Sequence, residues 1–174
     1  MRKLVKIILI VSCCFTAAAT IATLEGIRIN ITKSYPRGIY QMTDAPITKG
    51  AMVIFCPNQN SVVEEGRNRG YVMAGFCPGG TGAMIKKVFA AQNDRVEISR
   101  AGVFVNGQLL ANSQPKMTDS AGRILPHLET TISALDKRHV LLMSDYSAKS
   151  FDARYFGPTD KSQIISVIRP LWTW

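Results

Sequence analysis

The sequence has few residues that bind metals and lacks the cysteine spacing of a zinc site. Among 174 residues there are two histidines, His127 and His139, and no cysteine pair is spaced as C-x-x-C. Zinc sites need clustered histidine and thiolate ligands, so we expect no metal site. The glycine run 79–82 lacks the Gly-Lys-[Ser/Thr] ending of a phosphate-binding loop, and we interpret it as a turn.

Acidic residues are also scarce, with 12 Asp and Glu against 21 Lys and Arg and a formal net charge of +9. Setting aside the three bases before residue 7 leaves 18 bases against 12 acids, a net charge of about +6 for residues 25–174. Such an excess suits a surface near anionic lipid headgroups. The bases are scattered and no helix-turn-helix, zinc or aromatic RNA-binding signature accompanies them, so we expect no nucleic acid partner.

A long apolar stretch lies at the N-terminus. Residues 7–24 carry no charge and are long enough, as a helix, to cross most of the apolar thickness of a bilayer. Arg2, Lys3 and Lys6 precede the stretch, and the positive-inside tendency keeps them in the cytoplasm. The sequence therefore predicts a membrane segment over residues 1–24 and a single extracytoplasmic domain over residues 25–174.

Two alternatives to an uncleaved anchor remain open. The run Ala17-Ala18-Ala19 offers a small-x-small site for cleavage of a signal peptide. The run from Ile10 to Cys13 resembles a lipoprotein box. All three interpretations place the domain in the same compartment, at or near the periplasmic face of the bacterial inner membrane.

The four cysteines fall into two groups. Cys13 and Cys14 lie in the apolar stretch and are interpreted as small helix residues. Cys56 and Cys77 lie in the exported part, where an oxidising compartment favours a disulfide between them. The chain-entropy model assigns about 3 kcal/mol to closing that loop.

After residue 24 the sequence alternates short apolar strands with turns, and no long stretch has a helical period. Asn106-Gly107 is the strongest hairpin signal. Two polar segments, Cys56–Gly82 and Asn112–Leu135, are predicted to be long surface loops. The fold class is therefore mainly β with one N-terminal helix. The predicted strands cover residues 51–55, 83–90, 95–99, 102–110, 139–144 and 163–171.

The first segment that indicates chemistry is Asn30–Tyr40, NITKSYPRGIY. Ser34 is followed closely by Pro36 and Gly38, which impose the irregular backbone that can hold a nucleophile exposed. It lies ten residues beyond the apolar stretch, near the bilayer surface. Taken alone, the motif is equally compatible with an ordinary turn.

The second segment is a lysine pair within an apolar strand. Strand alternation puts Lys86 on one face with Met84 and Val88, and Lys87 on the other, so at least one lysine lies against apolar surface. Burial disfavours an ammonium ion, and such a lysine can act as a base near neutral pH. In the alternative interpretation both stems follow the core and both amines reach water.

The third segment runs from Ser144 to Pro158. If it is extended, Ser150, Asp152 and Arg154 lie on one side, where the carboxylate and the guanidinium can pair and the hydroxyl can orient a lysine amine. The alternative is an ordinary ion pair in a loop.

Together and in this order the three segments resemble the signal peptidase I family of bacterial serine peptidases. That family has a serine box after its membrane segment, a Lys-[Arg/Lys]-Val strand box and a closing Gly-Asp-x-x-x-x-Ser-x-Asp-Ser-Arg-Tyr-x-Gly box, whose start corresponds here to Ser144-Asp145. The likeness runs from about residue 30 to residue 174. The matching residues here are Ser34, Lys86-Lys87-Val88 and Ser150-Phe151-Asp152-Ala153-Arg154-Tyr155-Phe156-Gly157.

The resemblance implies a role for each matching residue. Ser34 is implied to attack the scissile carbonyl, and Lys86 to accept and return its proton. Thr32 matches the hydroxyl that joins the Ser34 backbone N–H in an oxyanion hole. Ser150 and Asp152 are implied to position Lys86, with Arg154 holding Asp152. No cofactor is implied.

The serine box is most similar to that of the conjugal transfer branch of the family, with the form Asn-x-[Ser/Thr]-x-Ser-x-Pro-x-Gly-x-Tyr. That likeness implies a pilin precursor as substrate, closed head to tail or simply trimmed, with inner membrane lipid and conjugation machinery proteins as partners. Departures from general signal peptidases put the housekeeping role in doubt. These are Tyr35 after the serine, Gln92-Asn93-Asp94 after the lysine strand, and Ser144-Asp145-Tyr146 in the last box.

Two other functions remain open. One is a general type I signal peptidase that removes N-terminal signal peptides. The other is a non-catalytic anchored scaffold of a pilus or secretion assembly, in which Ser34 and Lys86 are turn and core residues.

Overall fold

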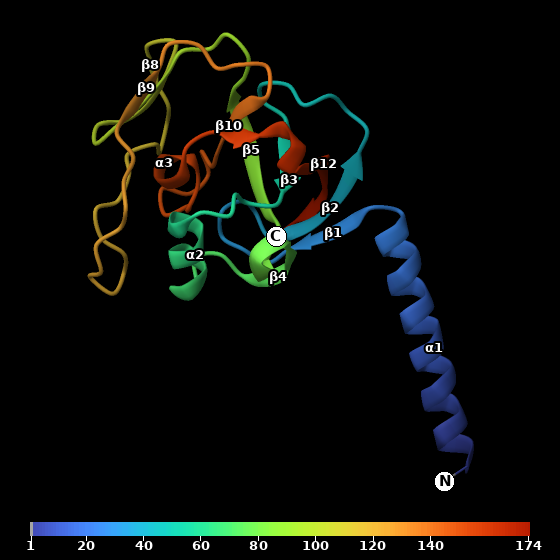
Figure 1. Ribbon diagram of the computed structural model, residues 1–174. Coiled ribbons are helices and arrows are strands. Elements are labelled where there is room, and N and C mark those ends of the chain that lie inside the picture. The colour runs from blue at the N-terminus through green and yellow to red at the C-terminus, as the bar shows by residue number, and fades with distance from the viewer. Residues whose placement is uncertain (1) are drawn as a thin grey trace.

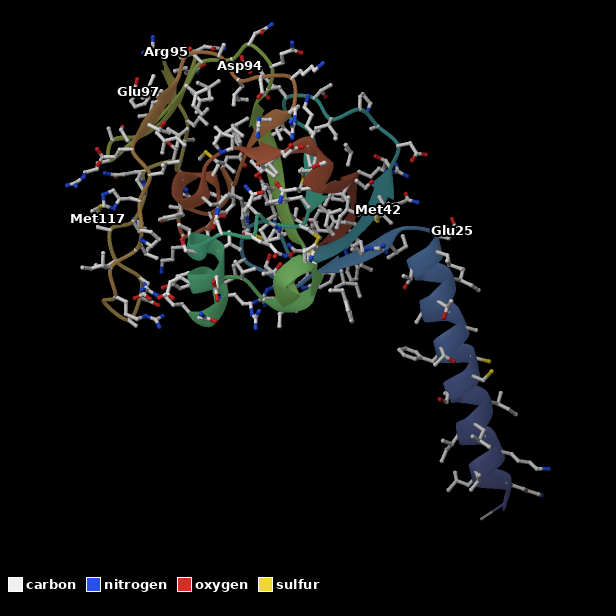
Figure 2. The ribbon with its side chains drawn as sticks, in the orientation of Figure 1. Glu25, Met42, Asp94, Arg95, Glu97 and Met117 are labelled. Carbon is white, nitrogen blue, oxygen red and sulfur yellow. A yellow bond between two sulfur atoms is a disulfide. The ribbon has the colours of Figure 1, made fainter. Side chains whose placement is uncertain are left out.

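The computed structural model describes residues 2–174 and shows one long helix attached to a β body (Figure 1). Helix α1, Arg2–Leu24, projects away from the body, and within Lys3–Leu24 an 18-residue window with mean hydropathy 2.3 is fully exposed. The helix is long and apolar enough to be a membrane anchor or a signal sequence. Glu25 and Met42 mark its junction with the sheet in Figure 2, where the Met42 N–H donates to the Gly26 carbonyl.

The larger sheet has seven strands, and each neighbouring pair is antiparallel. Strand β5 lies between β3 and β10, so the lysine pair occupies an interior strand. In spatial order the strands are β1 (Ile27–Asn30), β2 (Gly38–Thr43), β12 (Ile164–Thr173), β3 (Met52–Phe55), β5 (Met84–Ala90), β10 (His139–Met143) and β11 (Thr159–Asp160).

The smaller sheet confirms the predicted hairpin. Asn106 and Gly107 both have positive φ, 52° and 81°, as a tight two-residue turn requires. In spatial order its strands are β8 (Gln108–Leu109), β7 (Gly102–Val105), β6 (Val96–Ser99) and β9 (Thr130–Ile132). The fold is mainly β with one long N-terminal helix, as predicted.

Strands β1 and β2 were absent from the predicted strands, although they flank Ser34. IRIN is only four residues long, and GIYQMT mixes polar with apolar residues without strict alternation. Pairing with the long strand β12 stabilises β2 as a strand, and β2 in turn pairs with β1. This is a tertiary contact that a local pattern does not contain.

The predicted surface loop, Cys56–Gly82, contains more regular structure than its composition indicated. It holds α2 (Ser61–Asn68) and β4 (Ala74–Cys77), and a 3₁₀ turn, Pro78–Gly80, follows. Helix α2 is capped by the Asn60 side chain, which accepts a hydrogen bond from the Val63 N–H at 2.9 Å. Eight residues are too few to show a helical period.

The core forms three clusters around the larger sheet. Strand β5 contributes to all three from both of its faces. Val88 belongs to the cluster with α2 and α3 (Ala153–Phe156), and Ala90 to the cluster with the smaller sheet. Ile85, on the other face, belongs to the cluster with Tyr35 of the serine loop. Strand β5 therefore connects the parts of the domain that carry the candidate site. A second 3₁₀ turn, Lys161–Gln163, leads into β12.

The predicted disulfide joins Cys56 to Cys77, with a Cα–Cα distance of 5.5 Å. We expect the double change Cys56→Ser and Cys77→Ser to lower the free energy of unfolding by about 3 kcal/mol, because the unfolded chain regains the entropy of an open loop. Denaturant unfolding of the full chain in detergent measures the change. The matched control is Cys13→Ser with Cys14→Ser, since both thiols are free and exposed on α1. Equal stability of the two double variants would contradict the prediction.

Candidate active site

Ser34 lies at the centre of the loop that joins β1 to β2. The loop is closed from within by Asn30, whose side chain is buried. The side-chain oxygen Oδ1 of Asn30 accepts from the Thr32 N–H at 3.0 Å and from the Thr32 hydroxyl at 2.8 Å. Its amide donates to the carbonyls of Tyr35 and Pro36 at 3.2 and 3.0 Å. These bonds fix the backbone on both sides of Ser34.

The end of the serine loop lies tightly against the last strand. The Tyr40 hydroxyl donates to the Pro36 carbonyl at 2.7 Å. A Cβ on Gly38 would lie 2.2 Å from the Trp172 carbonyl oxygen, so only glycine fits where β2 meets β12. The glycine of the serine box is therefore required by packing.

Tyr35 connects the serine loop to the segment after β10. Its buried hydroxyl donates to the Met143 carbonyl at 3.3 Å and to Asp145 Oδ1 at 3.1 Å, while Lys87 Nζ donates to Asp145 Oδ2 at 2.9 Å. Burial, and next the charge of Asp145, raises the pKa of Tyr35, which keeps the phenol a donor. The Ser144 hydroxyl donates to the Ser34 carbonyl. Tyr35, Lys87, Ser144 and Asp145 were each noted from the sequence, but no contact among them was predicted.

Lys86 is the buried member of the lysine pair. Its side chain is 1% exposed in strand β5, opposite Val53 of β3. Desolvation lowers the pKa of Lys86 to about 8, and the negative charge of Asp152 opposes that shift in part. Lys87 is one-third exposed and pairs with Asp145. The expectation that at least one lysine lies against apolar surface is confirmed.

Asp152 and Arg154 form a buried ion pair. Arg154 Nε and Nη2 each donate to one carboxylate oxygen at 2.8 Å, and both side chains are fully buried. The Ser144 N–H donates to Asp152 Oδ2 at 3.1 Å, and Arg154 Nη2 donates to the Ser150 carbonyl at 2.7 Å. The predicted pairing is therefore confirmed in a fully hydrogen-bonded form.

The segment is not extended throughout, so the condition under which Ser150, Asp152 and Arg154 would alternate along one side is not met. Asp152 is the N-cap of helix α3 and accepts a hydrogen bond from the Arg154 N–H at 3.3 Å, so Arg154 lies on a helical turn. A capping aspartate favours a helix start at this point, and the pair forms within one turn. Strict alternation along residues 150–154 could not reveal this.

Ser150 lies beside Ser34. Its side chain is buried, and the two hydroxyl oxygens are 3.5 Å apart. The recorded contact of the Ser150 hydroxyl is thus with the serine rather than with Lys86, and a role in positioning the lysine stays a prediction. The Thr32 hydroxyl donates to Asn30, so its place in an oxyanion hole also stays a prediction.

A cleft of about 470 Å³ opens beside Ser34, and we call it the Ser34 cleft. Its lining combines apolar rings with hydroxyl and ammonium groups. The side chains that line it are those of Lys33, Ser34, Tyr71, Lys116, Thr118, Asp119, Ser120, Leu125, Ser147, Lys149, Ser150, Phe151 and Tyr155. The two facing hydroxyls therefore open onto a space that can receive a peptide side chain.

Comparisons with known proteins indicate the family of the chain. The family model for signal peptidase, peptidase S26, matches residues 1–173. A plasmid transfer protein TraF from Escherichia coli is 52% identical over 149 residues, covering 86% of this chain and 84% of the relative. A conjugal transfer protein TraF from Agrobacterium tumefaciens strain 15955 is 36% identical over 163 residues, covering 92% and 90%. The crystal structure of a signal peptidase I from Enterococcus faecalis V583 aligns with TM-score 0.41 and 14% identity, covering 72% of this chain and 98% of that chain.

The buried Lys86 should weaken the fold at neutral pH. Because its folded pKa of about 8 lies below the unfolded value of 10.5, the unfolded state binds the proton more tightly, and the cost is present below pH 8 and vanishes above 10.5. We expect Lys86→Met to raise the free energy of unfolding by about 3 kcal/mol at pH 7. Denaturant unfolding between pH 7 and 11 measures the gain, which should shrink as pH rises. Lys87→Met is the control, since Lys87 is partly exposed; a loss of stability in Lys86→Met would contradict the prediction.

Proposed function

This chain belongs to the signal peptidase S26 family, and from that premise we propose that it is a membrane-anchored serine endopeptidase with a Ser34–Lys86 dyad. The observation that carries the proposal is a lysine with complete burial and a pKa lowered to about 8, in the strand box of the family. A lysine in that state is a base at the pH of the cell envelope. A non-catalytic scaffold would not need a buried lysine with a lowered pKa.

In the proposed mechanism Ser34 Oγ attacks the scissile carbonyl while the neutral amine of Lys86 takes the hydroxyl proton. The Ser34 N–H stabilises the oxyanion together with the Thr32 hydroxyl, which turns away from its bond to Asn30 when the substrate binds. The Lys86 ammonium then gives its proton to the leaving amine, and an ester on Ser34 remains. A second nucleophile, deprotonated by Lys86, attacks the ester and releases Ser34.

Asp152 and Ser150 support the dyad in different ways. The charge of Asp152 raises the pKa of Lys86 and so stabilises the ammonium formed on proton transfer, while Arg154 keeps that charge fixed. Ser150, at 3.5 Å from the Ser34 hydroxyl oxygen, orients the nucleophile. The lysine therefore needs no histidine partner.

The proposed substrate is a conjugative pilin precursor, with other conjugation proteins as partners. Support comes from the names of relatives, which are plasmid transfer proteins TraF at 52% and 51% identity and a conjugal transfer protein TraF at 36% identity. Ser34 cleaves the precursor near its C-terminus. Either water resolves the acyl-enzyme and gives a linear pilin, or the amine at the N-terminus of the same pilin does so and closes the chain.

The proposed location is the periplasmic face of the inner membrane, with α1 as the anchor. The basic residues before the apolar stretch support this orientation. At the other end of the chain, Trp172 and Trp174 are exposed where β12 pairs with the start of β2. Exposed tryptophans suit the interface between lipid and water, which supports a position of the serine loop close to the bilayer.

Matched lysine variants test the dyad. We expect Lys86→Arg to lower kcat by about a thousandfold or more, because arginine keeps its proton, whereas Lys87→Arg retains the pair with Asp145 and most of the activity. For the unaltered chain, kcat/KM should rise with pH and level off above about 8, since the reactive lysine is the neutral form. Initial rates of precursor cleavage measure both. Full activity in Lys86→Arg would remove Lys86 from the mechanism.

Intact mass measurement distinguishes the two fates of the acyl-enzyme. The full chain is incubated with a conjugative pilin precursor, and a cyclic product is expected one water lighter than the linear trimmed product. Ser34→Ala is the control and should leave the precursor uncut. A trimmed product of linear mass alone would reject cyclisation, and an uncut precursor with the active chain would reject the pilin as substrate.

A further inference from the structure

The Ser34 cleft carries an unusual concentration of positive charge. Lys33, Lys116 and Lys149 line it, and Asp119 is its only acidic residue within residues 3–174. The floor is apolar, with the rings of Phe151 and Tyr155 stacked at 5.3 Å between centroids. Charge at the rim over an apolar floor is the pattern of a site that recognises a charged peptide.

The single acid does not neutralise the lysines, because it already has partners. Asp119 accepts hydrogen bonds from the Tyr71 hydroxyl and from Arg123 Nε. The first of these bonds is the main cause that lowers the pKa of Asp119. In the part of the chain that the structure describes, none of the three lysines forms a salt bridge. Three ammonium groups therefore remain free to bind an anion.

The backbone that carries these lysines is held in place. The Lys116 N–H donates to the Tyr155 hydroxyl at 3.0 Å. Lys149 lies between Ala148 and Ser150, whose carbonyls accept from Arg154 at 3.1 and 2.7 Å. Fixed attachment points reduce the entropy lost when the side chains order around a ligand.

We propose that the Ser34 cleft selects substrates that carry a carboxylate within a few residues of the scissile bond, through Lys116 and Lys149 with Lys33 beside the nucleophile. The inference rests on the proposed peptidase function. The carboxylate is either an Asp or Glu side chain or the free C-terminus of the segment that is removed. Apolar side chains next to it pack on Leu125 and Phe151.

A peptide suits this cleft better than a lipid headgroup. Leu125, Phe151 and Tyr155 line the cleft together with the lysines, so it offers apolar contacts for peptide side chains that a lipid headgroup cannot use. The cleft is also bounded by the hydroxyls of Ser34 and Ser150, which are groups of the proposed catalytic site. Anionic vesicles nevertheless serve as a competitor in the test.

Binding to a catalytically silent chain tests the inference separately from catalysis. Four fluorescent decapeptides share an Ala-Ala-Ala core; each carries Glu or Gln two residues before its end, and the end is either a free acid or an amide. Fluorescence anisotropy measures Kd for full-length Ser34→Ala in detergent. We expect at least one carboxylate to tighten Kd about tenfold, less at 0.5 M salt. Comparison of the Glu-amide and Gln-acid peptides shows whether the cleft binds the Glu side chain or the C-terminal carboxylate.

The lysines are tested by adding Lys116→Gln and Lys149→Gln, which should abolish the preference for carboxylates. The matched control adds Lys137→Gln and Lys161→Gln, an equal loss of charge at lysines that do not line the cleft. Equal Kd for all four peptides would overturn the inference. So would a preference that survives the cleft variants, or binding of phosphatidylglycerol vesicles that these variants abolish while no peptide preference exists.

Cleavage of the same peptides by the unaltered chain separates the two proposals. Cleavage without carboxylate preference rejects only the proposal that the Ser34 cleft selects substrates with a carboxylate. Carboxylate-selective binding with no cleavage of these peptides or of a pilin precursor rejects only the peptidase function. Mass spectrometry of the products gives this readout.

Discussion

The structure depends on one electrostatic constraint, the burial of the Lys86 amine beside the Asp152–Arg154 pair. Desolvation disfavours the Lys86 ammonium, and the Asp152 carboxylate stabilises it. The Arg154 guanidinium donates two hydrogen bonds to Asp152, and its positive charge opposes that stabilisation. The balance leaves a pKa near 8. Because Asp152 also accepts from Ser144, and Arg154 donates to the Ser150 carbonyl, the charge environment of the lysine is tied to the backbone of the last box.

The same segment also holds the nucleophile loop. The Ser144 hydroxyl bonds the carbonyl of Ser34, and Asp145 bonds Tyr35, so residues 110 positions apart in the chain share one network. Lys87 completes it from the face of β5 opposite Lys86. Strand β5 thus carries the proposed base on one face, and on the other face Lys87, which is linked to the serine loop through Asp145 and Tyr35.

Local patterns predicted those features that depend on neighbouring residues. The Asn106-Gly107 turn, the apolar helix and the strand alternation around Lys86 each require only a few adjacent positions. The extended geometry considered for residues 150–154 does not form, because the Asp152 side chain caps helix α3 and this interaction outweighs the alternation of residue types. Strands β1 and β2 were missed, since β2 pairs with β12, which lies more than a hundred residues away, and β1 in turn pairs with β2.

The sequence by itself determined the fold class, the Cys56–Cys77 pair, and the residues proposed for catalysis, because residue type and spacing carry that information. Only the tertiary structure decided which lysine is buried, that Ser150 faces Ser34, and that lysines from three separate segments line one cleft. The physical reason is that burial and electrostatic environment are properties of the packed sheet order. No segment contains them until β3, β5 and β10 lie side by side.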